Sequence, residues 1–105
     1  MNTFDIFIAY IAWKGNGKTR PVLVLEQQGD VIYVFTITTQ YENKSEYVRA
    51  RYFKIIDWQQ AGLNSPSYID TNTIRDLPYA AINGRMPIGK LTAADEQRLI
   101  EFIGQ

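Results

Sequence analysis

The sequence predicts a small all-β barrel with one α-helix laid across it at the C-terminus, and three observations support this fold class. About five runs rich in Val, Ile and aromatic residues are separated by turns roughly every 8 to 12 residues. A Gly-Asp turn joins two of these runs into a hairpin. The last stretch of the chain has the cap and the apolar spacing of a helix.

The composition indicates a single folded domain with a restricted set of reactive groups. The chain of 105 residues is 46% hydrophobic, enough for one core, so we expect one domain over residues 1–105. It contains no Cys and no His, which excludes thiolate nucleophiles, Ser-His triads and the usual zinc sites, and we expect neither a metal nor a cofactor. Basic and acidic residues balance at 11 each, so there is no overall charge to attract nucleic acid.

The chain also lacks the marks of a membrane or secreted protein. No apolar run is long enough to span a bilayer, and the opening residues M-N-T-F-D lack the basic region of a signal peptide. We therefore expect a cytoplasmic protein without a membrane partner.

The first strand is expected from Asp5 to Trp13, where both faces are apolar, as in a central strand or a closed barrel. The K-G-N-G-K-T segment that follows (14–19) fits no regular element and is expected to form a mobile connection. It could cradle a phosphate, but it lacks P-loop spacing and leads into a strand rather than a helix. A flexible lid over a site is the favoured interpretation.

The stretch from Lys18 to Gln40 predicts the central hairpin, on which the candidate site is built. Because its strands are antiparallel, Arg20 and the pair Thr38 and Thr39 should be neighbours at one end. A guanidinium offers a planar fork of donors to phosphate oxygens, and a Thr hydroxyl can donate to the same group. The predicted ligand is a phosphodiester, although Thr is also an ordinary strand residue.

A further strand is expected from Glu46 to Lys54. Its alternation places Arg49 and Arg51 on one face, interleaved with Tyr47 and Phe53. Interleaved Arg and aromatic residues are typical of a platform for single-stranded nucleic acid. The alternative is an edge strand with solvated arginines.

The rest of the chain alternates short elements with breaks. Asp57 to Leu63 should form one or two helical turns, with Trp58 in the core. Residues 67–75 resume a β pattern, and residues 85–91 contain a short strand. Thr92 is expected to cap the last helix. The buried stripe of this helix is expected to consist of Leu99, Ile100 and Ile103.

The order of these motifs resembles the PemK/MazF family of toxins from bacterial type II toxin–antitoxin pairs. Arg20-Pro21, then V-L-V-L, a hairpin and T-T-Q are similar to the central part of that family. Further matches are D-I-F-I (5–8), S-Y-I (67–69), I-R (74–75) and I-G-K-L-T-A-A-D (88–95). The resemblance implies a compact SH3-like barrel that pairs as a homodimer.

The resemblance also implies an activity: sequence-selective, metal-independent cleavage of single-stranded RNA, in which the ribose 2′-hydroxyl attacks the adjacent phosphorus. Such a reaction needs an acceptor for the 2′-proton, donors for the developing charge and help for the leaving oxygen. Arg20 falls on the family's Arg-Pro position, which implies phosphate stabilisation, and Thr38 falls on its active-site threonine. The implied partners are single-stranded RNA and an antitoxin whose peptide blocks the same groove.

The remaining candidates would contact the substrate. Lys14 and Lys18 could hold neighbouring phosphates or be solvated in their loop, while Thr39 and Gln40 flank the active-site threonine. The candidate substrate-binding residues are Lys14, Lys18, Thr39, Gln40, Arg49 and Arg51.

The sequence does not identify the residue that acts as the general base. Some family members use an Arg and an Asp on the late strand with a His in the early loop, but residues 69–73 are I-D-T-N-T and the chain has no His. The remaining candidates are Asp70, Asp76 and Glu26. The alternative function is therefore a catalytically silent barrel that binds nucleic acid or a protein partner.

Overall fold

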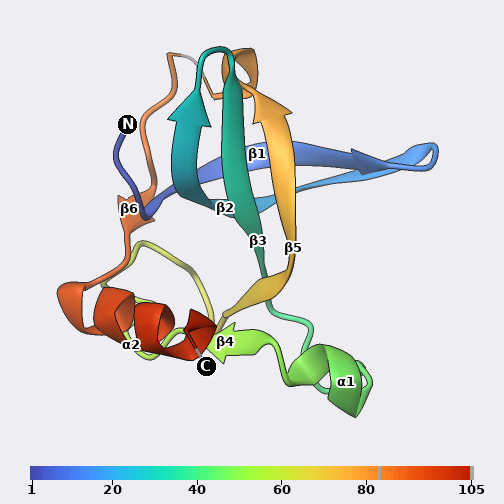
Figure 1. Cartoon of the computed structure of the whole chain (residues 1–105), viewed down its shortest axis with the longest axis vertical. Coiled ribbons are helices and arrows are strands. Elements are labelled where there is room, and N and C mark those ends of the chain that lie inside the picture. The colour runs from blue at the N-terminus through green and yellow to red at the C-terminus, as the bar shows by residue number, and fades with distance from the viewer. Residues whose placement is uncertain (83, 105) are drawn as a thin grey trace.

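The computed structural model describes residues 1–82 and 84–104, which form one curled antiparallel sheet with a helix at the C-terminus (Figure 1). The sheet has six strands in the order β4-β5-β3-β2-β1-β6. The strands are β1 (Asp5–Trp13), β2 (Asn16–Gln28), β3 (Val31–Thr38), β4 (Tyr52–Lys54), β5 (Tyr68–Pro78) and β6 (Gly89–Lys90). The helical elements are α1 (Glu46–Arg49), the 3-10 turn η1 (Tyr79–Ala81) and α2 (Ala93–Ile103). This is the predicted mainly-β class, with the sheet curled into a half-barrel above α2.

The segment after β1 is a tight hairpin, so the prediction of a mobile connection is wrong. β1 and β2 pair as far as Trp13 and Asn16, which leaves Lys14 and Gly15 in the turn. Both turn residues have positive φ, 37° and 78°, as two-residue hairpin turns require. Lys18 consequently lies within β2 rather than in a loop, and the hairpin extends as an arm beyond the rest of the sheet (Figure 1).

Apolar residues fill both faces of the sheet. The cluster on the α2 side includes Ile6, Leu23, Phe35, Ile37, Ile69 and Leu99. The cluster on the opposite face includes Phe7, Ile11, Val22, Val34, Leu77 and Ile82. This second face carries the polar groups of the candidate site, because Arg20 lies two positions before Val22 along β2 and therefore on the same side.

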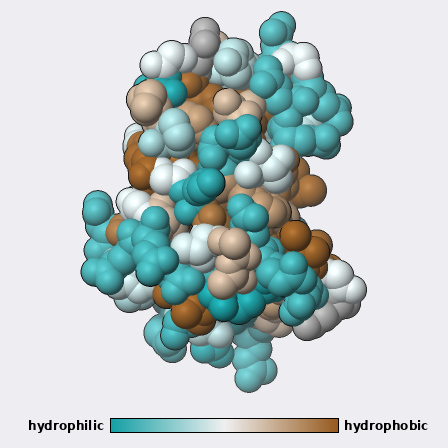
Figure 2. All heavy atoms as spheres, turned by 90° about the vertical axis from the view of Figure 1, so that its left-hand side faces the viewer, coloured by the Kyte–Doolittle hydropathy of each residue, from teal (hydrophilic) through white to brown (hydrophobic). Residues whose placement is uncertain are grey.

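The surface mixes apolar and hydrophilic groups. On the side nearest β6 and the start of α2, apolar side chains appear in small separate areas among hydrophilic ones (Figure 2). None of the helices in the described part of the chain is long and apolar enough to cross a membrane.

The segment predicted as a strand over Glu46–Lys54 is divided into α1 and the short strand β4. The hydroxyl of Ser45 accepts the N–H of Val48 at 3.3 Å, and Glu46 lies in the first turn. This N-cap outweighs the alternating pattern, so strand pairing begins only at Tyr52. The interpretation as a nucleic-acid platform is therefore wrong, because Tyr47 and Arg49 lie on α1 while Phe53 is buried in the core. The alternative of an edge strand holds for β4, which lies at the edge of the sheet.

The buried side of α2 also differs from the predicted stripe. Leu99 is fully buried, but Ile100 and Ile103 are 54% and 48% exposed. The buried line runs instead through Asp95, Leu99 and Phe102, which are spaced four and three residues apart. The prediction placed the stripe wrongly because an apolar pattern does not reveal a buried carboxylate.

Asp95 joins α2 to the segment that follows β4. Its carboxylate accepts the N–H groups of Ile56 and Asp57 at 3.2 and 2.8 Å, and it accepts Nε and Nη2 of Arg98 at 3.1 and 2.6 Å. Thr92 donates its hydroxyl to Asp57 and accepts the N–H of Asp95, which confirms the predicted cap. One polar network thus joins α2 to the segment after β4, in addition to the apolar contacts of Leu99 and Phe102.

The predicted helical turn near Trp58 is present as a hydrogen-bonded turn, in which Ala61 N–H donates to the carbonyl of Asp57 at 3.1 Å. It ends at Gly62, whose φ is 90°. A Cβ on Gly62 would lie 2.2 Å from the carbonyl oxygen of Ile88.

The close approach at Gly62 gives a stability prediction with a matched control. Gly29→Ala meets open space but has φ 60°, so it should cost about 1–2 kcal/mol for the left-handed backbone alone. Gly62→Ala should cost about 1–3 kcal/mol more, because the neighbouring backbone must move. Urea unfolding of both variants measures the difference, and equal losses would show that the contact with Ile88 does not matter.

Candidate functional site

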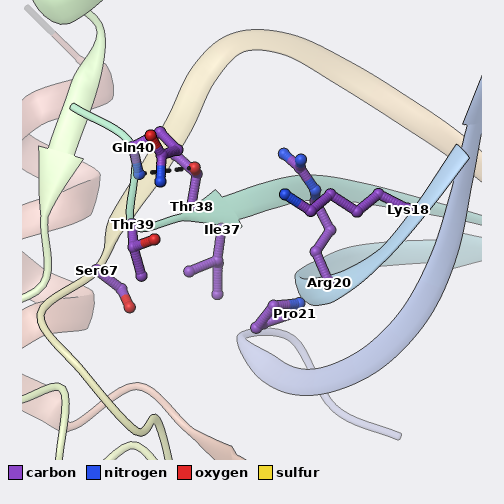
Figure 3. A pocket seen from close by; sticks show the side chains of 8 residues that line it. All are labelled: Lys18, Arg20, Pro21, Ile37, Thr38, Thr39, Gln40 and Ser67. Carbon is purple, nitrogen blue, oxygen red and sulfur yellow. Dashed lines mark hydrogen bonds between the residues drawn. The ribbon is translucent and has the colours of Figure 1, made fainter. Parts of the chain in front are cut away.

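Arg20 and Thr38 lie together at one end of the central hairpin. β2 pairs with β3 through Val22 and Thr36, and continuing this register two residues outward sets Arg20 opposite Thr38. Cross-strand partners share a face of the sheet. Figure 3 shows Thr38 and Ile37 on opposite sides of the β3 ribbon, with the guanidinium end of Arg20 on the Thr38 side.

A pocket of about 140 Å³ lies between these strand ends. Its lining residues are Lys18, Arg20, Pro21, Ile37, Thr38, Thr39, Gln40 and Ser67 (Figure 3). The cations come from β2, and the hydroxyl and amide groups come from the end of β3 and the segments beyond it. The structure therefore brings five of the predicted site residues into one pocket, two cations beside three polar side chains.

Hydrogen bonding prepares both central side chains for a ligand. The Thr38 hydroxyl oxygen accepts the N–H of Gln40 at 3.0 Å, which orients the hydroxyl and leaves its proton free to donate. The Nε of Arg20 is buried and has no hydrogen-bond partner among the described residues. A guanidinium carries five N–H donors, so the Nη groups of Arg20 remain as donors for a ligand in the pocket that this residue lines.

A second, larger pocket of about 360 Å³ adjoins Arg20. It is lined by Ile11, Trp13, Lys14, Arg20, Thr36, Lys44, Tyr52, Asp70 and Arg75. Arg20 borders both pockets, and its guanidinium carbon lies 5.8 Å from the centre of the Trp13 ring. The predicted residue Lys14 thus lies in the second pocket rather than beside Thr38.

The register of the sheet explains why Thr36, Tyr52 and Asp70 line the same pocket. Thr36 on β3 pairs with Asp70 on β5, and Asp70 pairs with Tyr52 on β4, so the three share a face. Burial and the negative charge of Asp70 raise the pKa of Tyr52 above its ordinary value, while Arg20 acts in the opposite direction. Its phenol therefore stays protonated at neutral pH and remains a hydrogen-bond donor.

Of the three candidate bases, only Asp70 lines a described pocket together with Arg20. Glu26 and Asp76 both pair with Tyr33, farther along β3 from Thr38. Their side chains are exposed there. A contact between either of them and a phosphate held by Arg20 has no support in this arrangement.

Arg49 and Arg51 lie apart from Arg20. The guanidinium of Arg49 is 5.5 Å from the Tyr41 ring and 3.9 Å from the carboxylate of Glu42. Arg51 uses its carbonyl to accept the N–H and hydroxyl of Thr71 at 3.0 and 2.6 Å. Neither lines a pocket with Arg20, and their role in substrate binding stays a prediction.

Several pocket residues were missed by the sequence analysis. These are Trp13, Thr36, Lys44, Tyr52 and Arg75. Thr36 could have been found, because it precedes Thr38 by two residues and must share its face. Tyr52 could not, because its position depends on where α1 ends and β4 begins.

Comparison with known proteins gives close structural matches. A solved structure of the Mycobacterium tuberculosis toxin MazF-mt6 is 28% identical, has a TM-score of 0.70, and is matched over 95% of this chain and 92% of its own. The fold is that of a MazF-type toxin. A second structure, named as an Mtb toxin, is also 28% identical to this MazF-like chain, with a TM-score of 0.64 and coverage of 93% and 97%.

These matches confirm the resemblance predicted from the sequence and support a toxin of a toxin–antitoxin pair. No protein-family model and no curated protein sequence matches the MazF-like chain. The assignment therefore depends on shape together with the residues at the end of the central hairpin.

Proposed function

We propose that this MazF-like chain is a metal-independent, sequence-selective endoribonuclease that cleaves single-stranded RNA by attack of a ribose 2′-hydroxyl on the adjacent phosphorus. The observation that carries the proposal is the pocket in which the cation of Arg20 meets the hydroxyl of Thr38. A phosphodiester oxygen can accept from the Nη groups of Arg20, and Lys18 in the same pocket adds a second positive charge.

The reaction assigns distinct tasks to these groups. The 2′-oxygen forms a bond to phosphorus while the bond from phosphorus to the 5′-oxygen breaks, which leaves a 2′,3′-cyclic phosphate and a 5′-hydroxyl. The negative charge that develops on the phosphate oxygens is stabilised by Arg20 and by donation from the Thr38 hydroxyl. Because the chain has no His, the two proton transfers fall to a carboxylate, a phenol, a cation or the substrate's own phosphate.

We further propose that the protein acts in the cytoplasm as a homodimer and that a cognate antitoxin peptide neutralises it by covering the groove at Arg20. The similarity to MazF toxins supports a paired antitoxin. Apolar side chains that are exposed in the single chain, such as Tyr10 at 61% and Ile74 at 59%, offer surface for such contacts.

Substitution of Thr38 tests the proposal. Thr38→Val removes the hydroxyl and keeps the shape, so the cleavage rate of a long single-stranded RNA in chelator should fall about 10- to 100-fold, the effect of one hydrogen bond to a charged group. Thr38→Ser keeps the hydroxyl and should retain most of the rate. Equal losses in the two variants would assign Thr38 a packing role, and an uncut RNA with the folded wild-type protein would contradict the proposed function.

A further inference from the structure

We propose that the pocket bounded by Trp13, Tyr52 and Asp70 binds one RNA base beside the cleaved phosphate and selects bases that carry an exocyclic amino group. This inference rests on the proposed function, because it takes RNA as the ligand of the Arg20 site. It adds a specificity determinant that the central hairpin alone does not supply.

The position of the pocket suits a base next to a bound phosphate. Arg20 lines both this pocket and the one that contains Thr38, so a phosphate held by its guanidinium lies between the two. The volume of about 360 Å³ falls in the range of roughly 300–1,000 Å³ that small-ligand sites occupy. Lys14 and Lys44 add positive charge for the neighbouring backbone.

Aromatic rings flank the pocket, as base stacking requires. Trp13 lies at the end of β1, lines the pocket and is 40% exposed, so part of its ring surface is accessible to a ligand. Tyr52 is held by tilted contacts with Tyr41 and Tyr68 at 6.2 and 6.5 Å, and those two rings stack on each other at 4.3 Å. A ring fixed in this way is already in place before a base binds.

The selectivity comes from Asp70. Its Oδ1 accepts both the backbone N–H and the side-chain Nδ2 of Asn72 at 2.9 Å, and within residues 1–82 and 84–104 no donor is placed on Oδ2. An ionised carboxylate only accepts hydrogen bonds. Oδ2 can therefore accept a hydrogen bond from the exocyclic amino group of cytosine, adenine or guanine. Uracil has no amino group and offers only its ring N3–H, flanked by two carbonyl oxygens that the carboxylate repels, so it is disfavoured.

The test compares Asp70→Asn with the wild type on an RNA library randomised around the cleavage site. Asp76→Asn makes the same change of charge on the same strand, at an exposed position outside this pocket. We expect wild type and Asp76→Asn to prefer an amino-bearing base over uracil at one fixed position near the cut. In Asp70→Asn, whose amide can also donate to a carbonyl, this preference should fall about tenfold.

Two results of the cleavage assay would overturn the inference. If Asp70→Asn slowed every cut equally and left the base preference unchanged, Asp70 would act on the reaction and not on the base. If the wild type tolerated uracil at every position around the cut, the pocket would not select a base at all.

A binding measurement separates this inference from the proposed function. Uncleavable RNAs with a 2′-deoxy residue at the cut, differing in the selected base alone, are titrated by fluorescence anisotropy. Binding that depends on the base and is abolished by Asp70→Asn supports the inference. It does so even if the wild-type protein cuts no RNA, because the absence of cleavage contradicts only the nuclease proposal. Trp13→Ala should weaken binding about 10-fold through lost stacking, and unchanged binding would overturn the aromatic site.

Discussion

Replacing Arg20 by alanine is expected to lower the rate of RNA cleavage by about 100-fold or more, the loss typical of removing one preorganised donor from a developing oxyanion. The same change should leave thermal unfolding nearly unaltered. It removes a buried donor that has no partner, which favours folding, and it removes the contact with the Trp13 ring, which is worth about 0.5–1 kcal/mol. These two effects on stability oppose each other.

Two controls make the Arg20 result specific. Arg20→Lys keeps the charge but loses the planar fork, so it should recover only part of the rate. Arg85→Ala removes a guanidinium that is exposed and donates to the carbonyl of Ile8 outside both pockets, and it should cut RNA at the wild-type rate. If Arg20→Ala unfolded the protein instead, its role would be structural.

Replacing Asp95 by alanine is expected to lower the free energy of unfolding by about 2–5 kcal/mol, because two backbone N–H groups lose their acceptor at about 1–3 kcal/mol each. The carboxylate is fully buried and accepts the N–H groups of Ile56 and Asp57, whereas Arg98 is 41% exposed and keeps Asp57 as a partner at 3.6 Å. Urea unfolding measures the effect. The remaining folded fraction should cut RNA normally, because the network lies on the α2 side of the sheet.

The control for Asp95 is Glu101→Ala on the same helix. Glu101 is exposed and, among the residues that the structure describes, accepts the side-chain amide of Gln97 alone, so the change should stay within about 0.5 kcal/mol of the wild type. Asp95→Asn keeps the shape of the side chain and one acceptor oxygen, so its loss of unfolding free energy should lie between those of Glu101→Ala and Asp95→Ala. A loss below about 1 kcal/mol for Asp95→Ala would show that the network does not hold α2 in place.

Local patterns in the sequence predicted the parts of the fold that local forces determine. The Gly-Asp turn placed Arg20 and Thr38 at the same end of a hairpin, and the structure brings them to one pocket. The cap at Thr92 followed from its position before a helical run. In both cases the outcome depends on neighbours in the chain rather than on distant packing.

The second pocket could not be predicted, because it depends on long-range register. Asp70 meets Thr36 only after an irregularity in the pairing of β3 with β5 between Val34 and Thr36, which alternation alone does not reveal. Tyr52 joins them because α1 delays the start of β4. A site whose lining residues come from five strands is determined by the whole sheet and not by any one motif.

The central claim is that the 2′-hydroxyl of the substrate performs the attack at Arg20, and one measurement tests it most directly. A labelled single-stranded RNA, first mapped for cut sites in the presence of chelator, is compared with the same RNA carrying a 2′-deoxy residue at the strongest site. The account predicts discrete cuts that leave 2′,3′-cyclic phosphate ends and that disappear at the deoxy position alone. Cuts that persist at that position would contradict it.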